Sequence, residues 1–556
     1  MSAIIEVDEA RPGAPSGGAP ARPWAGPGRL AVAAVVVAGV ALRAVAVSGA
    51  LGRPDSDEVL SSLLARHLWS DGWPAFLWGQ HYGGTIEALP VAVSYALFGS
   101  STFALRLPTL VLGVVAAVLV WRCALRLMPP GSARVAGLLA WVWPPAAVWF
   151  GTREQLFYGP TVVIGLGAIL LALRRADPAG GGGDRLGGRA ALEWAGLGLC
   201  LGLGWWTSPN IVYFALPAAF ALLFPPGRTR RVAWPGWRGV LVAGGAVLVG
   251  AGPWIVANIG SRVASLRDSQ GFTANGTYPE RLWWYVTHGL PAELGFREIG
   301  TLHWLGGLVG VLAYGAALVG LGVAARRAWS GPTSSGQRSS GRWAPGADLV
   351  GFVAFPFLFA TIPFGMDQAN LRYLFFLAPL LALLVARLAG GTRTATAVLV
   401  GALVITGVGL VRLDLLATSP NSTFRIGRSG ELGDVIRVLE AEHVDAVHAD
   451  YWVAYRLTFE SDERVIASPS AGALRSQADE TFVRTRPRAA WVVEADSSQQ
   501  QALLDRLDGL GVPARVVVAG EYAVVLTDGN IQPEQVPNEA RAPEGAERPP
   551  PPGQTY

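Results

Sequence analysis

The chain has 556 residues, of which 51% are hydrophobic and only 15% are charged, and its formal net charge at pH 7 is +4. So few charged residues exclude a typical soluble protein, and the dispersed basic residues disfavour a nucleic-acid-binding protein. Cys123 and Cys200 lie far apart, within or beside apolar segments, so neither a disulfide framework nor a cysteine metal site is supported. The composition predicts a protein that crosses a membrane several times.

Apolar segments with few charges recur between residues 30 and 412 and are typical of membrane-spanning helices. They predict a mainly α-helical, polytopic membrane helix bundle, with the transmembrane domain at residues 30–412. We expect about eleven spans. These spans fall at residues 30–50, 105–128, 133–150, 159–175, 191–208, 210–225, 238–259, 303–325, 347–365, 371–389 and 394–412.

Arginines concentrate in alternate connections between these segments. Because cytoplasmic loops carry an excess of basic residues, the arginine-rich connections mark the cytoplasmic side. We therefore expect a multi-pass protein of the cell membrane, with a cytoplasmic N-terminus and with everything after residue 412 outside the cytoplasm. The arginine-rich connections are residues 11–29, 122–134, 174–189, 228–238, 326–342 and 387–393.

Residues 51–104, after the first span, are predicted to form one long outer loop with juxtamembrane helices. Within it, residues 59–68 carry leucine and valine at helical spacing and predict an amphipathic helix. The apolar stretch 85–99 cannot cross the membrane without placing residues 122–134 on the wrong side. We therefore expect it to lie in the outer interface or to re-enter the membrane.

After residue 412 the pattern changes, and alternating helical and β-like stretches predict a small extracytoplasmic α/β domain at residues 413–530. ELGDVIRVLEAEHV and QQQALLDRLDGL have the periodicity of helices, whereas DAVHADYW, RVIASP and AAWVVEA predict strands. ARVVVAG followed by YAVVLTDG is typical of a hairpin. Residues 1–29, on the cytoplasmic side, and residues 531–556 are expected to be disordered tails.

The outer loop begins with PDSDE at residues 54–58, which places Asp55, Asp57 and Glu58 at membrane level. Such residues can cap a helix and complement its dipole. They can also serve an active site, because transfer of a group to a hydroxyl needs a base that takes the hydroxyl proton. We assign Asp57 as that base, with Asp55 as an alternative base or hydrogen-bonding partner and Glu58 on another helix face. Capping explains Asp55 best, and metal binding stays open as a third interpretation.

The Asp57–Glu58 pair follows the first span, and LFGSSTFALRLPTLVLGVVAAVLVWRCALRL follows the outer loop. Over residues 30–175 this arrangement resembles the dolichyl-phosphate-mannose protein mannosyltransferase and aminoarabinose transferase group of GT-C-type glycosyltransferases. NLRYLFFLAPLLALLVA is similar to the Arg-Tyr helix of that group. The resemblance implies a GT-C-like fold, a polyprenyl-phosphate sugar donor, transfer on the outer face and Asp57 as base. The chain departs from the group by having HYGGTIEALP where a Pro-Pro-Leu motif is usual, which leaves the acceptor open.

Two arginines on the outer side are candidates for substrate binding, because ionisable groups at membrane level are costly and need partners. Arg372, next to Tyr373, either holds the phosphate of the lipid donor or pairs with Asp367. Arg153 lies beside Glu154, which is either a second catalytic carboxylate near the acceptor or one half of an interfacial ion pair.

A third outer segment, GQHYGGTIEALP, contains His81, Tyr82 and Glu87. These side chains either line the acceptor pocket or belong to a stretch that simply turns at Gly83 and Gly84.

Together these features predict a hexosyl- or pentosyltransferase that moves a sugar from a polyprenyl-phosphate donor to an extracytoplasmic glycan, lipid or protein of the cell envelope. The glycine-rich stretches lack the strand-turn-helix setting of a nucleotide site, which disfavours a soluble nucleotide-sugar donor. No residues are assigned to a metal, although a divalent cation stays open as a cofactor. The alternative is a transporter or flippase of lipid-linked glycans, which would place charges near the middle of spans and show pseudo-repeated halves.

Overall fold

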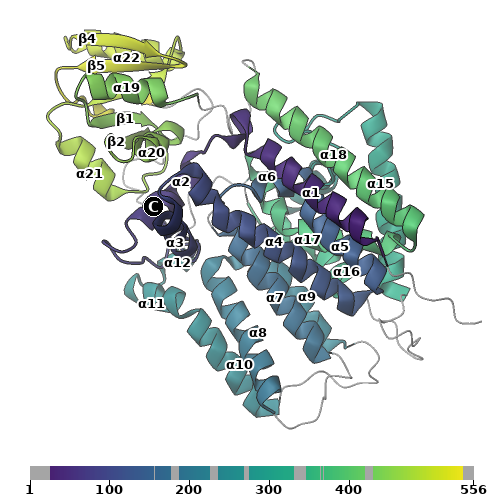
Figure 1. The fold of residues 1–556 in the computed structure, drawn as a ribbon. Helices are drawn as coiled ribbons and strands as arrows, with labels where there is room; N and C mark the ends of the chain where they lie inside the picture. Colours follow the sequence, from purple (N-terminus) through teal and green to yellow (C-terminus); the bar gives the residue numbers. More distant parts are fainter. Residues whose placement is uncertain are drawn as a thin grey trace, which may run out of the picture.

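The structure is a computed structural model that describes residues 26–155, 157–176, 187–225, 236–267, 275–330, 346–363, 365–366, 368–419 and 430–541. Most of both predicted tails, residues 1–25 and 542–556, therefore lies outside the described residues. The described chain forms a helical body and a C-terminal α/β domain at one end of it (Figure 1).

The helical body contains the following helices in chain order: α1 (Arg29–Ala46), η1 (Gly49–Gly52), α2 (Ser56–Arg66), α3 (Ala88–Phe98), α4 (Thr102–Leu127), α5 (Pro130–Val142), α6 (Pro145–Phe150), α7 (Tyr158–Ala176), α8 (Gly188–Thr207), η3 (Pro209–Ile211), α9 (Val212–Leu223), α10 (Gly236–Gly250), α11 (Gly252–Gly260), α12 (Ala264–Arg267), α13 (Tyr278–Trp284), η4 (Tyr285–Gly289), α14 (Leu290–Leu294), α15 (Leu308–Ser330), α16 (Ala347–Phe359), η5 (Gln368–Phe376), α17 (Ala378–Val385), η6 (Ala386–Leu388) and α18 (Thr392–Thr418).

Each predicted span coincides with helical structure. Five helices of the described chain, α1, α4, α7, α15 and α18, are long and apolar enough to cross a membrane, and α10 with α11, bent by 58°, makes a sixth if the pair is one span. Shorter apolar helices, among them α9, α16 and α17, occupy other predicted spans. These helices indicate a multi-pass helical membrane protein. The number of about eleven spans stays a prediction.

Prolines interrupt a segment that the sequence predicts as one span. At residues 133–150, α5 ends at Val142 and α6 begins at Pro145, after Pro144. Because proline has no backbone N–H and restricts the residue before it, two successive prolines end the first helix and allow a second to start at a new angle.

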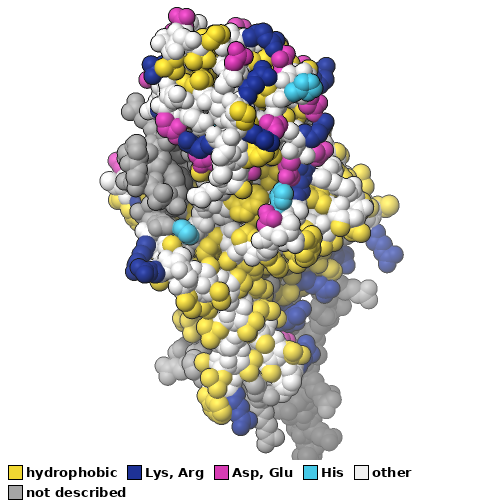
Figure 2. Space-filling model, turned by 90° about the vertical axis from the view of Figure 1, so that its left-hand side faces the viewer, with side chains coloured by type: hydrophobic (Ala, Val, Ile, Leu, Met, Phe, Trp, Pro, Cys, Tyr) yellow, Lys and Arg dark blue, Asp and Glu magenta, His cyan; other side chains and the backbone are white. Residues whose placement is uncertain are grey.

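The surface of α18 shows how the body is suited to lipid. One side of the helix is buried, through residues such as Leu399, Leu410 and Leu413, while the other exposes Val404 and Leu415. Large exposed apolar surfaces are typical of membrane contact. Figure 2 shows hydrophobic side chains over the helical body on the face in view, and charged side chains concentrated on the C-terminal domain.

The C-terminal domain is built around one sheet with the strand order β2-β1-β3-β5-β4. β1 is parallel to β2 and to β3, whereas β5 is antiparallel to β3 and to β4. The elements are α19 (Gly433–Ala441), β1 (Ala446–Asp450), α20 (Tyr451–Glu460), β2 (Ile466–Ala471), α21 (Gln477–Thr485), β3 (Ala490–Glu494), α22 (Ser498–Gly509), β4 (Ala514–Ala519), β5 (Tyr522–Thr527), η7 (Pro533–Gln535) and α23 (Asn538–Arg541).

The sheet is buried on both faces. Val447, Val492 and Val524 pack with α19 and α20 in one apolar cluster, whereas Trp491 and Val525 pack with α22 in another. The described domain continues beyond the expected boundary at residue 530, because Ile531, Val536 and Ala540 join the second cluster.

One predicted strand is shorter than the sequence indicates. DAVHADYW predicts a strand through Trp452, but β1 ends at Asp450 and α20 begins at Tyr451. The Asp450 side chain accepts a hydrogen bond from the backbone N–H of Trp452 at 2.9 Å and so caps the helix. This early turn places Tyr451 against the outer loop, because α20 packs on α2.

Candidate active site

The PDSDE segment forms the start of α2, and each of its carboxylates has a different environment. Asp55 is the N-cap of the helix, and its Oδ1 accepts a hydrogen bond from the backbone N–H of Glu58 at 2.9 Å. The prediction that Asp55 serves as a cap is confirmed. Asp55 also pairs with Arg153 at 2.7 Å, and burial raises the pKa of its carboxyl above the ordinary value while Arg153 opposes that rise.

Glu58 is fully buried in a closed ion-pair cluster. Both of its carboxylate oxygens accept from Arg106 of α4, at 2.5 Å and 2.7 Å, and Arg153 lies 3.3 Å away. The backbone N–H of Glu154 donates to Glu58 at 3.2 Å. Burial by itself would raise the pKa of Glu58, but Arg106 and Arg153 outweigh it and hold the pKa below the ordinary value.

Asp57 forms a different, open ion pair. Its side chain is 22% exposed and that of Arg372 is 31% exposed. Arg372 donates to Oδ2 at 3.0 Å, and the hydroxyl of Tyr451 in the C-terminal domain donates to Oδ1 at 2.6 Å. The carboxylate retains further lone pairs that can accept a proton or a hydrogen bond from a substrate. Asp367, the other partner considered for Arg372, lies outside the described residues.

Arg372 and Arg153 line one small cavity. Within the described chain, Nε and Nη1 of Arg153 and Nε of Arg372 are buried without a hydrogen-bond partner. Buried donors of this kind are costly unless a ligand accepts from them. The remaining lining residues are Thr109, Phe150, Gln155, Tyr158, Gly159 and Phe375.

Tyr373 borders this cavity through Tyr158. The two rings lie edge to face with centroids 6.1 Å apart. Tyr373 thus follows the predicted phosphate-binding arginine in the sequence and packs against Tyr158, which lines the cavity, but it does not line the cavity itself.

Glu87 and Glu154 form a buried carboxyl pair. Both side chains are almost completely buried and interact with each other, while Thr109 donates to Glu87 at 2.9 Å. Burial raises the pKa of Glu87 to about 7. Arg153 pairs with Asp55 and Glu58 rather than with its sequence neighbour Glu154.

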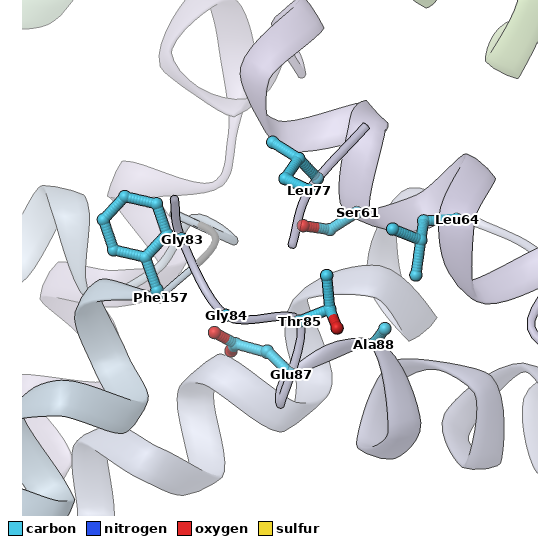
Figure 3. Close-up of a pocket in the computed structure, with 9 residues that line it drawn as sticks. All are labelled: Ser61, Leu64, Leu77, Gly83, Gly84, Thr85, Glu87, Ala88 and Phe157. Carbon is cyan, nitrogen blue, oxygen red and sulfur yellow. The ribbon is translucent and has the colours of Figure 1, made fainter. Parts of the chain in front are cut away.

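Glu87 lines a second small cavity, between the outer loop and the start of α7. Figure 3 shows Glu87 and Phe157 lining it together with Ser61, Leu64, Leu77, Gly83, Gly84, Thr85 and Ala88. A Cβ at Gly83, whose φ is +74°, would lie 2.5 Å from the Phe157 ring, and one at Gly84 would lie 2.6 Å from the Trp206 carbonyl oxygen. Both glycines are therefore needed for the close approach of this loop, as well as for its turn.

The remaining two predicted residues lie in the same loop. The Tyr82 ring packs against Phe157 with centroids 6.5 Å apart, and burial raises the pKa of its hydroxyl while Arg475 opposes that rise. His81 is half-buried and belongs to the lining of neither cavity described above.

The structure thus brings Asp55, Asp57, Glu58, Arg153, Glu154 and Arg372 together around α2, with Tyr373, Tyr82 and Glu87 bordering them. Sequence reasoning missed Arg106, Tyr451 and Arg475. An arginine near the start of an apolar segment needs a partner, which was the available signal for Arg106. Tyr451 and Arg475 lie in a separate domain and carry no motif. Among the described residues, no group of three or more His, Cys, Asp or Glu side chains could hold a metal ion.

Comparisons with known proteins identify relatives of the fold. The family model described as dolichyl-phosphate-mannose-protein mannosyltransferase matches residues 88–256. ArnT from Cupriavidus metallidurans in the apo state is similar with a TM-score of 0.58 and 13% identity, covering 91% of this chain and 98% of that chain. The same enzyme bound to undecaprenyl phosphate has a TM-score of 0.59 and 13% identity, covering 90% and 98%.

The Archaeoglobus fulgidus oligosaccharyltransferase in complex with Zn and sulfate has a TM-score of 0.43 and 12% identity, covering 86% of this chain and 69% of that chain. No curated protein matches. The predicted resemblance is confirmed, and the chain has an ArnT-like GT-C fold.

Proposed function

We propose that the chain is an integral-membrane glycosyltransferase that moves a sugar from a polyprenyl-phosphate donor to an acceptor hydroxyl on the extracytoplasmic side. The observation that carries this proposal is the cavity lined by Arg153 and Arg372, whose orphaned N–H groups lie next to the open Asp57 ion pair. It offers an anion site and a base within one small region.

The two arginines are suited to the phosphate of the donor. Guanidinium groups keep their charge at all relevant pH values and bind phosphate oxygens in a planar, bidentate manner. A lipid-linked phosphate also fits the comparisons, because the matching family is named for a dolichyl-phosphate sugar and one ArnT structure holds undecaprenyl phosphate.

Asp57 supplies the base. As the acceptor oxygen attacks the anomeric carbon, Asp57 accepts the hydroxyl proton, and the bond between that carbon and the phosphate oxygen breaks. The departing polyprenyl phosphate gains negative charge, which Arg372 and Arg153 stabilise. Asp55 and Glu58 are less suited to this role, because each is buried and held by Arg153 or Arg106.

The second cavity is our candidate for the acceptor or the sugar hydroxyls. Its polar lining of Ser61, Thr85 and Glu87 offers hydrogen-bonding groups without a cation, which suits an uncharged hydroxyl-rich molecule. We infer from the arginine distribution that this site and the C-terminal domain lie outside the cytoplasm and that the N-terminus lies inside.

Transfer by the purified chain tests the proposal. The full-length protein in proteoliposomes is given radiolabelled polyprenyl-phosphate sugars, with envelope membranes as acceptor. We expect label to reach the acceptor with the wild type and to fall by at least about 100-fold with Asp57→Asn. Transfer unaffected by Asp57→Asn would remove Asp57 from its role. No transfer with any donor, together with measured movement of the lipid-linked sugar across the bilayer, would favour a flippase.

A further inference from the structure

We propose that the C-terminal α/β domain completes the active site, with Tyr451 as a positioning residue for the carboxylate of Asp57 and with Arg475 supporting Tyr451. This inference rests on the proposed function, because it assumes that Asp57 is the base. It adds a role for a domain that lies far from α2 in the sequence.

Tyr451 and Arg372 hold Asp57 from two sides. The Tyr451 hydroxyl donates to Oδ1 at 2.6 Å, and Arg372 donates to Oδ2 at 3.0 Å. Each oxygen therefore has one fixed donor, and the plane of the carboxylate is set by groups from two different domains. A base must face its substrate in one orientation, and a fixed carboxylate needs no reorganisation when the acceptor arrives.

The backbone at the start of α20 is tied to the start of α2. The Ser56 hydroxyl donates to the carbonyl oxygen of Tyr451 at 2.6 Å, and Ser56 directly precedes Asp57. Tyr451 is only 8% exposed, and its ring packs edge to face against Tyr455 with centroids 5.6 Å apart. Main-chain and side-chain contacts of Tyr451 thus meet adjacent residues of α2, which fixes the distance between the two helices.

Arg475 supports Tyr451 from the other side. Its positive charge opposes the rise that burial causes in the pKa of the Tyr451 hydroxyl, and its guanidinium donates to Gln80 in the outer loop at 2.7 Å. A hydroxyl close to a cation becomes a stronger donor to its own acceptor. The chain of contacts therefore runs from Gln80 through Arg475 and Tyr451 to Asp57.

The outer loop and the segment around Arg475 are in close contact. Gly79 has φ +66°, and a Cβ there would lie 2.4 Å from the carbonyl oxygen of Leu474. At the far end of α2, Arg66 pairs with Asp462 at 2.9 Å and His67 contacts Glu463 at 2.7 Å. Contacts at both ends of α2 thus hold the C-terminal domain against the outer loop.

The test replaces the Tyr451 hydroxyl alone. Tyr451→Phe keeps the ring and its packing but removes the donor to Asp57. We expect kcat to fall about tenfold while KM for the lipid donor stays within about twofold, because the lost hydrogen bond acts on the base rather than on the phosphate site.

Tyr522→Phe is the matched control, because Tyr522 is buried in β5 of the same domain and packs in the apolar core of that domain. It should retain the wild-type kcat and KM, and Arg475→Gln should show a smaller fall in kcat than Tyr451→Phe. Wild-type kinetics in Tyr451→Phe, or an equal loss in Tyr522→Phe, would overturn the inference while leaving the transferase intact. A wild type without transferase activity would overturn the proposed function and this inference together.

Discussion

Asp57 and Glu58 are neighbours in the sequence, yet their ion pairs differ in kind. The Glu58 and Arg106 side chains are 0% and 4% exposed, and the arginine contacts both carboxylate oxygens. The Asp57 and Arg372 side chains are 22% and 31% exposed and share one contact at 3.0 Å. A closed pair has its hydrogen-bonding capacity used within the protein, whereas an open pair can exchange a partner for a substrate.

The helix itself produces this difference. Successive residues of an α-helix point about 100° apart, so Glu58 can face α4 while Asp57 faces Arg372 and the C-terminal domain. Asp348 and Arg387 provide a second closed pair, with exposed fractions of 0% and 8% and contacts to both oxygens at 2.6 Å and 2.9 Å. Burial and the number of contacts thus separate ion pairs that hold the fold from one that is suited to chemistry.

Replacing Glu58 by glutamine should give the largest loss of stability. Glu58→Gln leaves Arg106 and Arg153 buried beside a neutral group, and we expect the free energy of unfolding to fall by about 4 kcal/mol. Thermal unfolding in detergent measures this loss, and Asp57→Asn is the matched control with a change of about 1 kcal/mol or less. Equal unfolding temperatures for Glu58→Gln and the wild type would show that the closed pair does not hold the fold.

Glu87 extends the comparison to a buried carboxyl that accepts a hydrogen bond from Thr109 and interacts with Glu154. Its pKa of about 7 in the folded protein, against 4.5 ordinarily, means that the folded chain keeps a proton that the unfolded chain loses. Stability should therefore fall by about 3 kcal/mol as the pH rises from 4.5 to 7 and then level off. Glu87→Gln cannot lose this proton, so its unfolding temperature should depend less on pH. An unchanged pH dependence in the variant would contradict this assignment.

Substitutions in the Asp57–Arg372 pair should change substrate binding more than they change the free energy of unfolding. We expect Arg372→Gln to raise KM for the polyprenyl-phosphate donor about tenfold or more, with a smaller rise in Arg372→Lys, which keeps the charge but loses the planar fork. Arg412→Gln is the control, because Arg412 is 52% exposed and pairs with Glu298 outside the site. Donor titration of the transfer rate measures the effect. A similar KM for Arg372→Gln and the control would remove Arg372 from the phosphate site.

The sequence predicts the helices well but not the pairs between them. Long apolar segments specify where helices form, because burial in lipid requires continuous apolar stretches, and each predicted span coincides with helical structure. The capping role of Asp55 was also predictable, because it depends only on residues within one turn.

The partners of Asp57 were not predictable, because Arg372 and Tyr451 are 315 and 394 positions away from it. Adjacent charges were equally misleading at Arg153 and Glu154, which suggested an ion pair but contact different groups. Such pairings depend on how helices and domains pack, which no local pattern in one sequence specifies.

The rate of sugar transfer by Asp57→Asn, measured beside Glu58→Gln at equal amounts of folded protein, tests the distinction between open and closed pairs most directly. We predict that Asp57→Asn loses at least about 100-fold in rate while its free energy of unfolding changes by about 1 kcal/mol or less. Glu58→Gln should instead lose stability, and its remaining folded protein should transfer sugar faster than Asp57→Asn. Wild-type transfer by Asp57→Asn would contradict the central role of the open pair.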